Sequence, residues 1–336
     1  VGKVVLANAA ADQSASFTFT IKLDDTGINK TYGGVPFTSG VGTITLQGGQ
    51  TKTITGLPTS ITYTVTEESA AGFTLKSKTG DNGTIQATTS TAVFTNEREK
   101  GVLNVSKQVI SDAAGDANET FTFTIKLSDN TINGAYGSMT FNNGESTVEL
   151  KKDETIKASG LPTSITYTVT EANAPGFQLT GKTGDTGTIS STASSAVFTN
   201  TRDTGALELD KTVVSDATAD ANETFTFTIK LNDTNIDKTY GGVQFTSGVG
   251  TVTLKHNESI TLSGMPTSIT YTVTEENAPG FTLSGKTGDN GTIKTTTSTA
   301  SFTNTRELGD LEVGKVVLSN AAADQSASFT FTIKLD

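Results

Sequence analysis

Short runs in which hydrophobic and polar residues alternate make up most of the chain, and glycine, asparagine, aspartate and proline separate them. In the run FTFTIKL, Phe17, Phe19, Ile21 and Leu23 share one face, and threonine dominates the other. A period of two is typical of a half-buried β-strand and not of a helix. No stretch shows convincing helical periodicity, so the pattern predicts an all-β protein.

The first hundred residues are expected to hold about eight such strands. Turn-forming sequences separate them, among them Gly33–Gly34, Gly56–Pro58 and Gly80–Gly83. The predicted strands are Lys3–Leu6, Ser16–Leu23, Val41–Leu46, Thr51–Thr55, Ser60–Glu67, Phe73–Ser77, Gly83–Gln86 and Ala92–Asn96. Seven or eight strands in about 100 residues indicate an immunoglobulin-like β-sandwich.

The whole pattern repeats along the chain. The motif ITYTVTE begins at Ile61, Ile165 and Ile269, a spacing of 104 residues. This period is the size of a small domain and is too long for a solenoid repeat of about 20–50 residues. We therefore expect tandem β-sandwich domains over residues 1–101, 102–205 and 206–309. The short links between them predict an elongated, stiff rod.

Residues 310–336 are expected to form the first strands of a truncated fourth repeat. Val313–Asp336 differs from Val1–Asp24 only at Ser319, which stands where the first repeat has Ala7. The fourth repeat thus resembles the first more than the second or third does, which suggests a higher-order unit of three domains. We interpret the chain as a section of a longer array.

Three polar residues fall on the apolar faces of predicted strands in every repeat. In the opening strand, a lysine shares the face of Leu and Val neighbours. In ITYTVTE, the glutamate follows Ile, Tyr and Val, and in the closing strand an asparagine follows Ala and Phe. The residues concerned are Lys3, Lys107, Lys211 and Lys315; Glu67, Glu171 and Glu275; and Asn96, Asn200 and Asn304.

Burying an unpaired lysine or glutamate costs on the order of several kcal/mol. Burial favours the neutral amine, which is a nucleophile, and the neutral acid, which can polarise an amide carbonyl. An amine held against an asparagine side chain could attack it, expel ammonia and leave an amide cross-link. The fold itself would supply the proximity that this reaction needs.

The pattern of an inward lysine in the first strand, Y-x-V-x-E followed by x-A-P-G-F, and F-T-N in the last strand resembles the collagen-adhesin B-type domain. It is also similar to the isopeptide-linkage domains of streptococcal pilins. The resemblance covers all three repeats and the start of the fourth, although Ala71 replaces the proline found at Pro175 and Pro279. It implies intramolecular isopeptide bonds with glutamate as the acid/base, joining Lys3 to Asn96 with Glu67, Lys107 to Asn200 with Glu171, and Lys211 to Asn304 with Glu275. Lys315 would need an asparagine outside this sequence.

A simpler interpretation stays open at this point. The same residues could form a buried Lys–Glu salt bridge with a hydrogen-bonded asparagine and no covalent bond. The occurrence of all three residue types on inward faces in three repeats favours the cross-link.

Composition narrows the function. The chain has no cysteine, which excludes disulfides and thiolate chemistry, and its net charge of −11 argues against nucleic-acid binding. No signal peptide, transmembrane helix or anchor is recognisable, and we expect no cofactor, no metal and no membrane insertion of this segment. An acidic, Thr-rich, cysteine-free array is typical of an extracellular protein of the bacterial cell surface.

These observations predict a structural stalk or fibre segment of a surface adhesin or pilus-like filament, which is not an enzyme apart from one cross-linking turnover per domain. Its partners would be neighbouring copies or other fibre subunits. The alternative is an adhesin module whose loops bind a host or matrix ligand, but the close similarity of the repeats favours a spacer.

Two weaker signals are expected to be structural. His256 is the only histidine, and its counterparts are Gly48 and Lys152, so we expect a solvated loop residue. The aspartates at Asp24–Asp25, Asp129 and Asp233 lack the dense spacing of a calcium loop and are expected to form turns.

Overall fold

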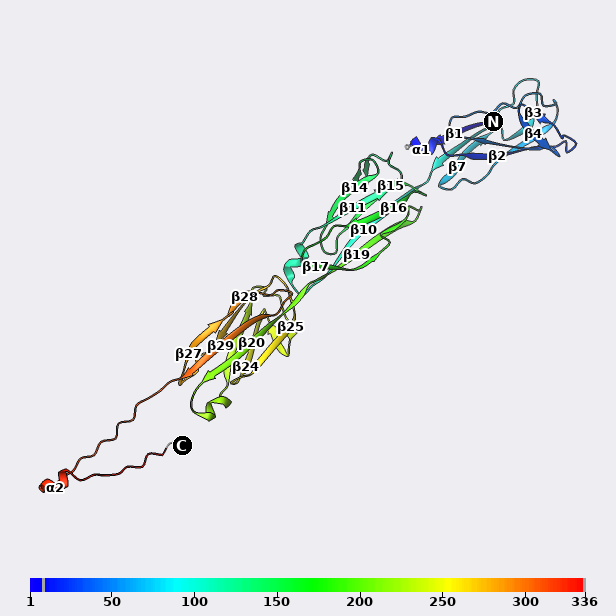
Figure 1. The fold of residues 1–336 in the computed structure, drawn as a ribbon. Coiled ribbons are helices and arrows are strands. Elements are labelled where there is room, and N and C mark those ends of the chain that lie inside the picture. Colours follow the sequence, from blue (N-terminus) through cyan, green and yellow to red (C-terminus); the bar gives the residue numbers. More distant parts are fainter. Residues whose placement is uncertain (8–9, 335–336) are drawn as a thin grey trace.

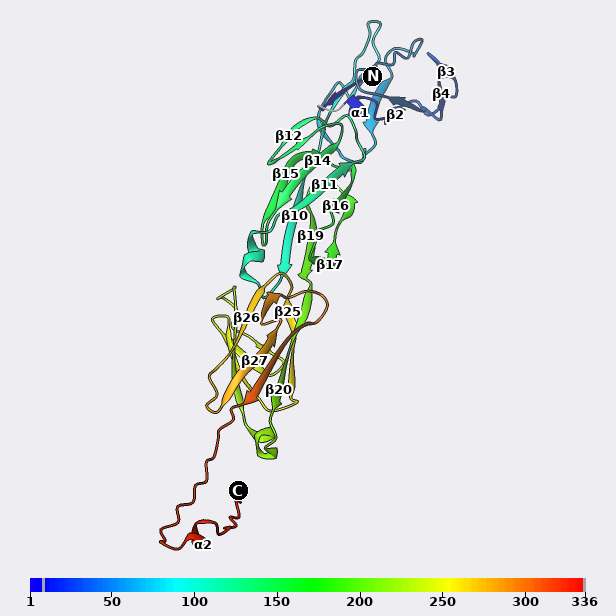
Figure 2. The same cartoon turned by 60° about the vertical axis from the view of Figure 1, so that its left-hand side comes forward.

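The computed structural model describes residues 1–7 and 10–334, and these form three β-sandwich bodies in a row (Figures 1 and 2). The bodies follow each other end to end along one axis, and a thin tail extends beyond the third. Nearly all regular structure is β-strand, as the alternation predicts.

The first domain is built from nine strands and one short helix. In chain order these are β1 Gly2–Leu6, α1 Ala10–Gln13, β2 Phe17–Leu23, β3 Thr31–Tyr32, β4 Val35–Thr38, β5 Val41–Leu46, β6 Thr62–Glu67, β7 Phe73–Thr79, β8 Asn82–Thr84 and β9 Val93–Arg98.

The second domain repeats the plan with one further edge strand and a 3-10 helix. Its elements are β10 Lys100–Ile110, η1 Ala114–Asn118, β11 Phe121–Leu127, β12 Gly134–Tyr136, β13 Met139–Phe141, β14 Glu145–Leu150, β15 Thr155–Pro162, β16 Thr166–Glu171, β17 Phe177–Thr183, β18 Thr186–Thr188 and β19 Ala193–Arg202.

The third domain matches the second. It consists of β20 Thr204–Val214, η2 Thr218–Asn222, β21 Phe225–Leu231, β22 Thr239–Tyr240, β23 Val243–Thr246, β24 Val249–Leu254, β25 Ser259–Pro266, β26 Thr270–Glu275, β27 Phe281–Thr287, β28 Asn290–Thr292 and β29 Ser298–Arg306. Helix α2, Ala322–Gln325, lies in the tail.

Each domain pairs its first strand with its last. One sheet of the third domain has the order β25-β20-β29-β27, in which β20 and β29 run parallel, and the other has the order β22-β23-β24-β21-β26-β28. The second domain has the same central strands, with β10 parallel to β19. Parallel pairing of the terminal strands means that the chain enters one end of a domain and leaves at the other.

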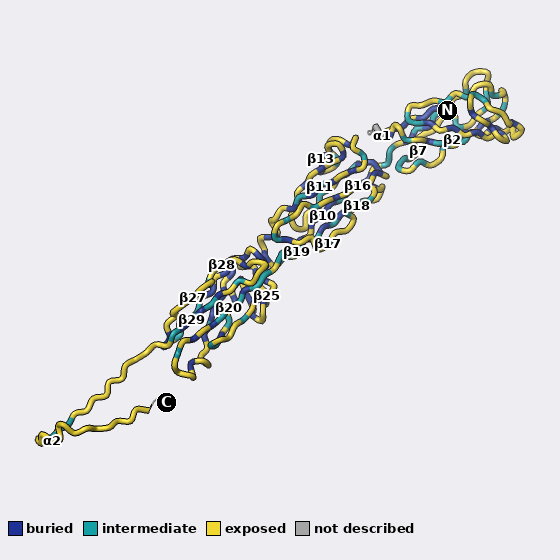
Figure 3. Tube along the Cα trace, viewed as in Figure 1, coloured by how far each residue is buried: buried dark blue, intermediate teal, exposed yellow. Residues whose placement is uncertain are grey.

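The alternating strands supply the core between the two sheets. Phe121, Phe123, Ile125 and Leu127 of β11 are all buried, while the intervening residues face outward. Figure 3 shows buried positions in the interior of the three bodies, whereas the tail is almost entirely exposed and has no buried position among its described residues. Burial of one face of each sheet is what the period of two provides.

The strand prediction was wrong at two places in the first domain. Thr51–Thr55 is not a strand there, although its counterparts lie in β15 and β25. In the second domain, β15 pairs with β10 from Lys100 onward, whereas β1 begins only at Gly2 and makes a single bridge to Thr51. The β3–β4 hairpin was missed because its strands are only two and four residues long.

Residues 307–334 lie outside every sheet of the structure. The first strands predicted there are not formed. In the complete domains, the first strand pairs with the last, and the second strand pairs with two later strands, β5 and β6 in the first domain. No counterparts of these partners follow within residues 310–336.

Among the described residues, no helix combines the length and apolar character needed to cross a membrane.

We expect the fully buried Leu103 to be a main anchor of the second domain. Leu103→Ala should lower the free energy of unfolding of that domain by about 2–5 kcal/mol, because it leaves a cavity between the sheets. The matched control is Ile110→Ala on the same strand, where the side chain is 58% exposed and the expected cost is about 0.5 kcal/mol or less. Native-state hydrogen exchange of the β10 and β19 amides measures both, and equal costs would contradict the assigned core.

Candidate functional site

The inward lysine of each domain lies at the centre of its first strand. All three lysines, Lys3, Lys107 and Lys211, are at most 2% exposed. In each domain an ionisable side chain is therefore enclosed by apolar neighbours. The strand alternation forces this, since the residues two positions before Lys107 and Lys211, Val105 and Leu209, are also buried.

The asparagine reaches the same space from the adjacent parallel strand. In the second domain Lys107 pairs with Phe198, and Asn200 pairs with Val109, so lysine and asparagine are offset by two residues. Two residues of strand span about 7 Å, a distance that the long lysine side chain can cover. Asn96, Asn200 and Asn304 are at most 3% exposed.

The glutamate comes from the opposite sheet. Glu67, Glu171 and Glu275 are the last residues of β6, β16 and β26, and each pairs with the second phenylalanine of the FTFTIKL strand. Their side chains are 2% exposed, and they point between the sheets toward the lysine. Register and burial therefore place the three residues predicted to face inward in the same space of each complete domain. Contacts join all three in the second and third domains, and in the first domain Lys3 contacts Glu67.

The three domains show complementary contacts within this group. The lysine Nζ lies 2.6 Å from Glu67 Oε1, 3.0 Å from Glu171 Oε1 and 3.0 Å from Glu275 Oε1. Asn200 Nδ2 donates to Glu171 Oε1 at 2.7 Å, and Lys211 Nζ donates to Asn304 Oδ1 at 2.6 Å. Glutamate thus contacts both other residues, and the amine reaches the amide that it would attack.

In the Lys–Glu–Asn group of the first domain, two buried oxygens remain without a donor. Within the described part of the chain, Glu67 Oε2 and Asn96 Oδ1 have no hydrogen-bond partner. Buried polar atoms are normally paired, so this arrangement is incomplete.

Aromatic rings close the site against water. The lysine Nζ lies 3.9 Å from the ring centre of Phe17, 4.0 Å from that of Phe121 and 3.9 Å from that of Phe225. On the asparagine side, Phe94 packs edge-on against Phe19 with ring centroids 5.1 Å apart. Strand alternation predicts that these phenylalanines lie in the core, but it does not mark them as the walls of the site.

Burial is the main influence on the amine. Loss of water lowers the pKa of Lys3, Lys107 and Lys211 below the ordinary lysine value, although the hydrogen bond and charge of the glutamate act in the opposite direction. A lowered pKa favours the neutral, nucleophilic form.

Lys315 is not part of such a group. It lies in the exposed tail, and its Nζ is 4.7 Å from the ring centre of Phe329. The repeat places Lys315 in register with Lys3 and Phe329 with Phe17, so this contact reproduces one side of the site without its glutamate or asparagine.

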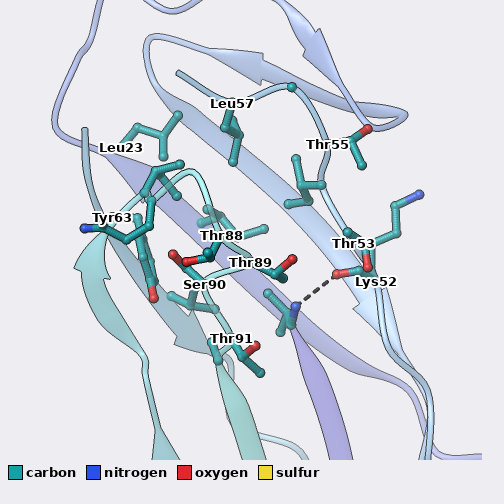
Figure 4. Close-up of a pocket in the computed structure, with 18 of the residues that line it drawn as sticks. Leu23, Lys52, Thr53, Thr55, Leu57, Tyr63, Thr88, Thr89, Ser90 and Thr91 are labelled. Atoms are coloured by element: carbon teal, nitrogen blue, oxygen red, sulfur yellow. Dashed lines mark hydrogen bonds between the residues drawn. The ribbon is translucent and has the colours of Figure 1, made fainter. Parts of the chain in front are cut away.

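A pocket of about 430 Å³ opens at the edge of the first domain, beside Lys52, Leu57 and Thr88–Thr91 (Figure 4). The amino group of Val1 donates to the Lys52 carbonyl at 2.9 Å across its floor. In the other domains this region is closed, since Leu161 and Met265, the counterparts of Leu57, are fully buried. The pocket therefore belongs to the unpaired edge of the first domain and is not a repeated site.

The weaker signals have structural roles. His256 is half-buried, not solvated as expected, and its Nδ1 accepts a hydrogen bond from the Val213 amide at 2.8 Å. Asp25, Asp129 and Asp233 each accept the amide of the residue two positions on, which is the hydrogen bond of an Asx turn.

The chain is a tandem-repeat all-β protein: it has three β-sandwich domains of one plan, and each encloses Lys, Glu and Asn between its sheets. The chain belongs to the family described as "Domain of unknown function (DUF7601)", whose model matches residues 1–98, 101–202 and 205–306. No curated protein matches the sequence.

Several solved structures are similar to the chain. A major pilin protein of Streptococcus pyogenes is 20% identical with a TM-score of 0.38, over 62% of this chain and 97% of the pilin. The TIE protein of Bacillus anthracis is 19% identical with a TM-score of 0.47, over 91% of this chain and 50% of that protein. The pilus adhesin SpaC of Lactobacillus rhamnosus GG is 14% identical with a TM-score of 0.33, over 93% and 44%.

The lowered lysine pKa predicts a pH dependence wherever the amine stays free. In an Asn200→Ala variant, Lys107 keeps its amine, and the unfolded chain holds a proton over a pH range in which the folded domain has released it. Stability of the second domain should therefore rise with pH toward the ordinary lysine value of 10.5, by at most about 1.4 kcal/mol per pH unit.

Urea unfolding between pH 8 and pH 10 measures this slope. The control is the double variant Asn200→Ala, Lys107→Met, which has all other titrating groups but no buried amine. A difference between the two that is flat or falls with pH would contradict the assignment.

Proposed function

We propose that each complete domain joins its first strand to its last by an isopeptide bond between lysine and asparagine, and that the array serves as a structural stalk. The observation that carries the proposal is the meeting of buried Lys, Glu and Asn in all three domains, on the two parallel terminal strands and the facing sheet. The pairs are Lys3–Asn96, Lys107–Asn200 and Lys211–Asn304.

The reaction needs no group besides these three. The neutral amine attacks the asparagine Cγ, an Nζ–Cγ bond forms, the Cγ–Nδ2 bond breaks and ammonia leaves. Glu67, Glu171 or Glu275 takes a proton from the attacking nitrogen and delivers one to the leaving nitrogen, the role of a general acid/base. The contacts of Glu171 with both Lys107 and Asn200 support this role.

The position of the bond suits a load-bearing element. A pull along the rod enters a domain through its first strand and leaves through its last, and these are the strands that the bond would join. The intervening strands would then carry no tension. By analogy with a disulfide that closes a loop of about 100 residues, the bond would also stabilise the fold by roughly 4–5 kcal/mol.

The proposed setting is extracellular, at the bacterial cell surface or in a filament, as the resemblance of the motifs implies. Its partners there would be neighbouring domains and other fibre subunits. The chain would turn over no external substrate, because its chemistry is used once within each domain.

Intact mass is the direct test of the cross-links. The chain should weigh less than its sequence by the mass of three ammonia molecules. Glu67→Ala should restore one ammonia, and peptide mapping should assign the loss of the bond to the first domain alone. Glu68→Ala, which changes the exposed neighbour, should leave all three bonds intact. A full, unmodified mass of the unaltered chain would sink the proposal.

Pulling on single molecules tests the stalk function. Lys211 and Asn304 are 93 residues apart, so a domain without its bond should release about 300 Å of chain on unfolding. Glu275→Ala should add one such step, whereas Glu276→Ala should add none. Long extension steps from the unaltered chain would show that its domains are not locked.

A further inference from the structure

An arginine ends the last strand of each domain, and between domains it forms a joint. Arg98 and Arg202 are only 10% exposed, although they lie at domain ends. Each guanidinium stacks on a phenylalanine of its own domain, with 4.7 Å to the ring centres of Phe73 and Phe177. Each is also paired with an aspartate of its own domain, Arg98 with Asp12 at 3.2 Å and Arg202 with Asp116 at 3.4 Å.

The same guanidinium binds the following domain. Arg202 donates to the Thr267 carbonyl from Nη2 at 2.9 Å, and Arg98 donates from Nη2 to the carbonyl of Thr163. A single residue links the last strand of one domain to the first strand of the next, and it also contacts this threonine. The carbonyl of Glu99 accepts the amide of Thr163, and the carbonyl of Asp203 accepts that of Thr267, both at 3.0 Å. Thr163 and Thr267 are consequently 3% and 6% exposed.

The joint between the second and third domains has an additional polar contact. Asp112, in the loop after β10, accepts hydrogen bonds from Lys238 Nζ at 2.7 Å and from the Tyr240 hydroxyl at 3.2 Å. Beside it, Ala113 is 6% exposed and packs into the hydrophobic core cluster of the third domain. The loop of one domain thus docks on the next.

The far end of the third domain carries the first half of this joint. Arg306 stacks on Phe281 with 4.9 Å to the ring centre, and it lies 3.7 Å from Asp220. The Glu307 amide donates to the Gly280 carbonyl at 3.0 Å, as the Glu99 amide donates to that of Gly72. However, Arg306 is 43% exposed, and Asp216 and Ala217, the counterparts of Asp112 and Ala113, are exposed as well.

The end of the first domain that lies away from the second carries the counterparts of the residues that receive the arginine and Asp112. Thr59 corresponds to Thr163 and Thr267 and sits in the same turn, since the next residue has a positive φ in all three domains, 69° at Ser60. Unlike them, Thr59 is exposed. Lys30 and Tyr32 occupy the positions of Lys238 and Tyr240, and Lys30 Nζ lies 5.7 Å from the Tyr32 ring centre.

We propose that the far end of the third domain is an interface for a domain with the sequence of the first. In this joint Arg306 binds the carbonyl of the Thr59 position, and Asp216 pairs with the Lys30 and Tyr32 positions. Residues 313–336, which repeat the first 24 residues with one change, begin such a domain directly after the linker. The inference is independent of the isopeptide bonds.

The charges of the existing joints support this choice of partner. At the joint between the second and third domains, Asp112 of the second pairs with Lys238 of the third. The residues at the corresponding positions of the first and second domains are Asn8 and Gly134, which are uncharged. By analogy with Asp112, Asp216 would pair with a lysine at the Lys238 position of the next domain. The first domain has Lys30 at that position, whereas the second has Gly134. An acid and a base occur together at the joint between the second and third domains, and neither occurs at the corresponding positions of the first and second.

The existing joint provides the first measurement. The chain has no cysteine, so two cysteines can be introduced, one in each of two adjacent domains, and spin-labelled. The distance distribution between the two labels then reports how the two domains move relative to each other. Arg202→Ala should broaden the distance distribution between domains two and three at least about twofold, since small domain interfaces permit motion by default. Arg306→Ala is the matched control and should leave that distribution unchanged.

The second measurement uses a lengthened chain in which residues 25–98 are copied after Asp336, so that a complete fourth domain follows. Arg306→Ala should now broaden the distribution between domains three and four. Asp216→Lys should do so too, and exchange of the copied Lys30 for aspartate in that variant should narrow it again. Far-UV circular dichroism verifies that each variant is folded, and this control does not depend on whether the isopeptide bonds form.

Two outcomes would overturn the proposal. One is a narrow distribution between domains three and four in the Arg306→Ala and Asp216→Lys variants alike. The other is a broad distribution in the unaltered lengthened chain while the joint between domains two and three stays narrow.

Discussion

The buried lysine amine is the constraint on which the rest of each domain depends. A cationic side chain between two β-sheets is tolerated only with partners that replace water, and the fold provides a carboxylate from the facing sheet and an amide from the adjacent strand. This requirement fixes the central strands as neighbours, β10 beside β19 and β20 beside β29, and it fixes their register. The aromatic rings around Nζ then keep the group dry.

Much of this arrangement could be predicted from the sequence because a period of two determines which way a side chain points. Lys107, Glu171 and Asn200 were placed inward from alternation alone, and in the structure they meet. Alternation says nothing about which strands are neighbours or about very short strands, so the β3–β4 hairpin was missed. Pairing partners decide whether an alternating segment becomes a strand, which explains why Thr51–Thr55 and residues 313–334 remain outside the sheets.

The joints between domains could not be predicted for a different reason. Arg98 and Arg202 end strands that alternate regularly, and an arginine at such a position ordinarily faces solvent. Only the arrangement of consecutive domains shows that the guanidinium is enclosed by a ring, an aspartate and a carbonyl of the next domain. An arginine recurs at the end of the last strand in each domain, at Arg98, Arg202 and Arg306, but only the neighbouring domain shows what this arginine binds.

Parallel pairing of the terminal strands has a mechanical consequence even before any bond forms. When the two ends of a domain are pulled apart, β10 and β19 slide along each other in opposite directions, so the load falls across their hydrogen bonds in shear. Strands pulled in shear must break many bonds together, whereas an antiparallel hairpin pulled at one end opens one pair at a time. The non-covalent domain therefore resists extension through the hydrogen bonds between its first and last strands, whether or not a covalent bond joins them.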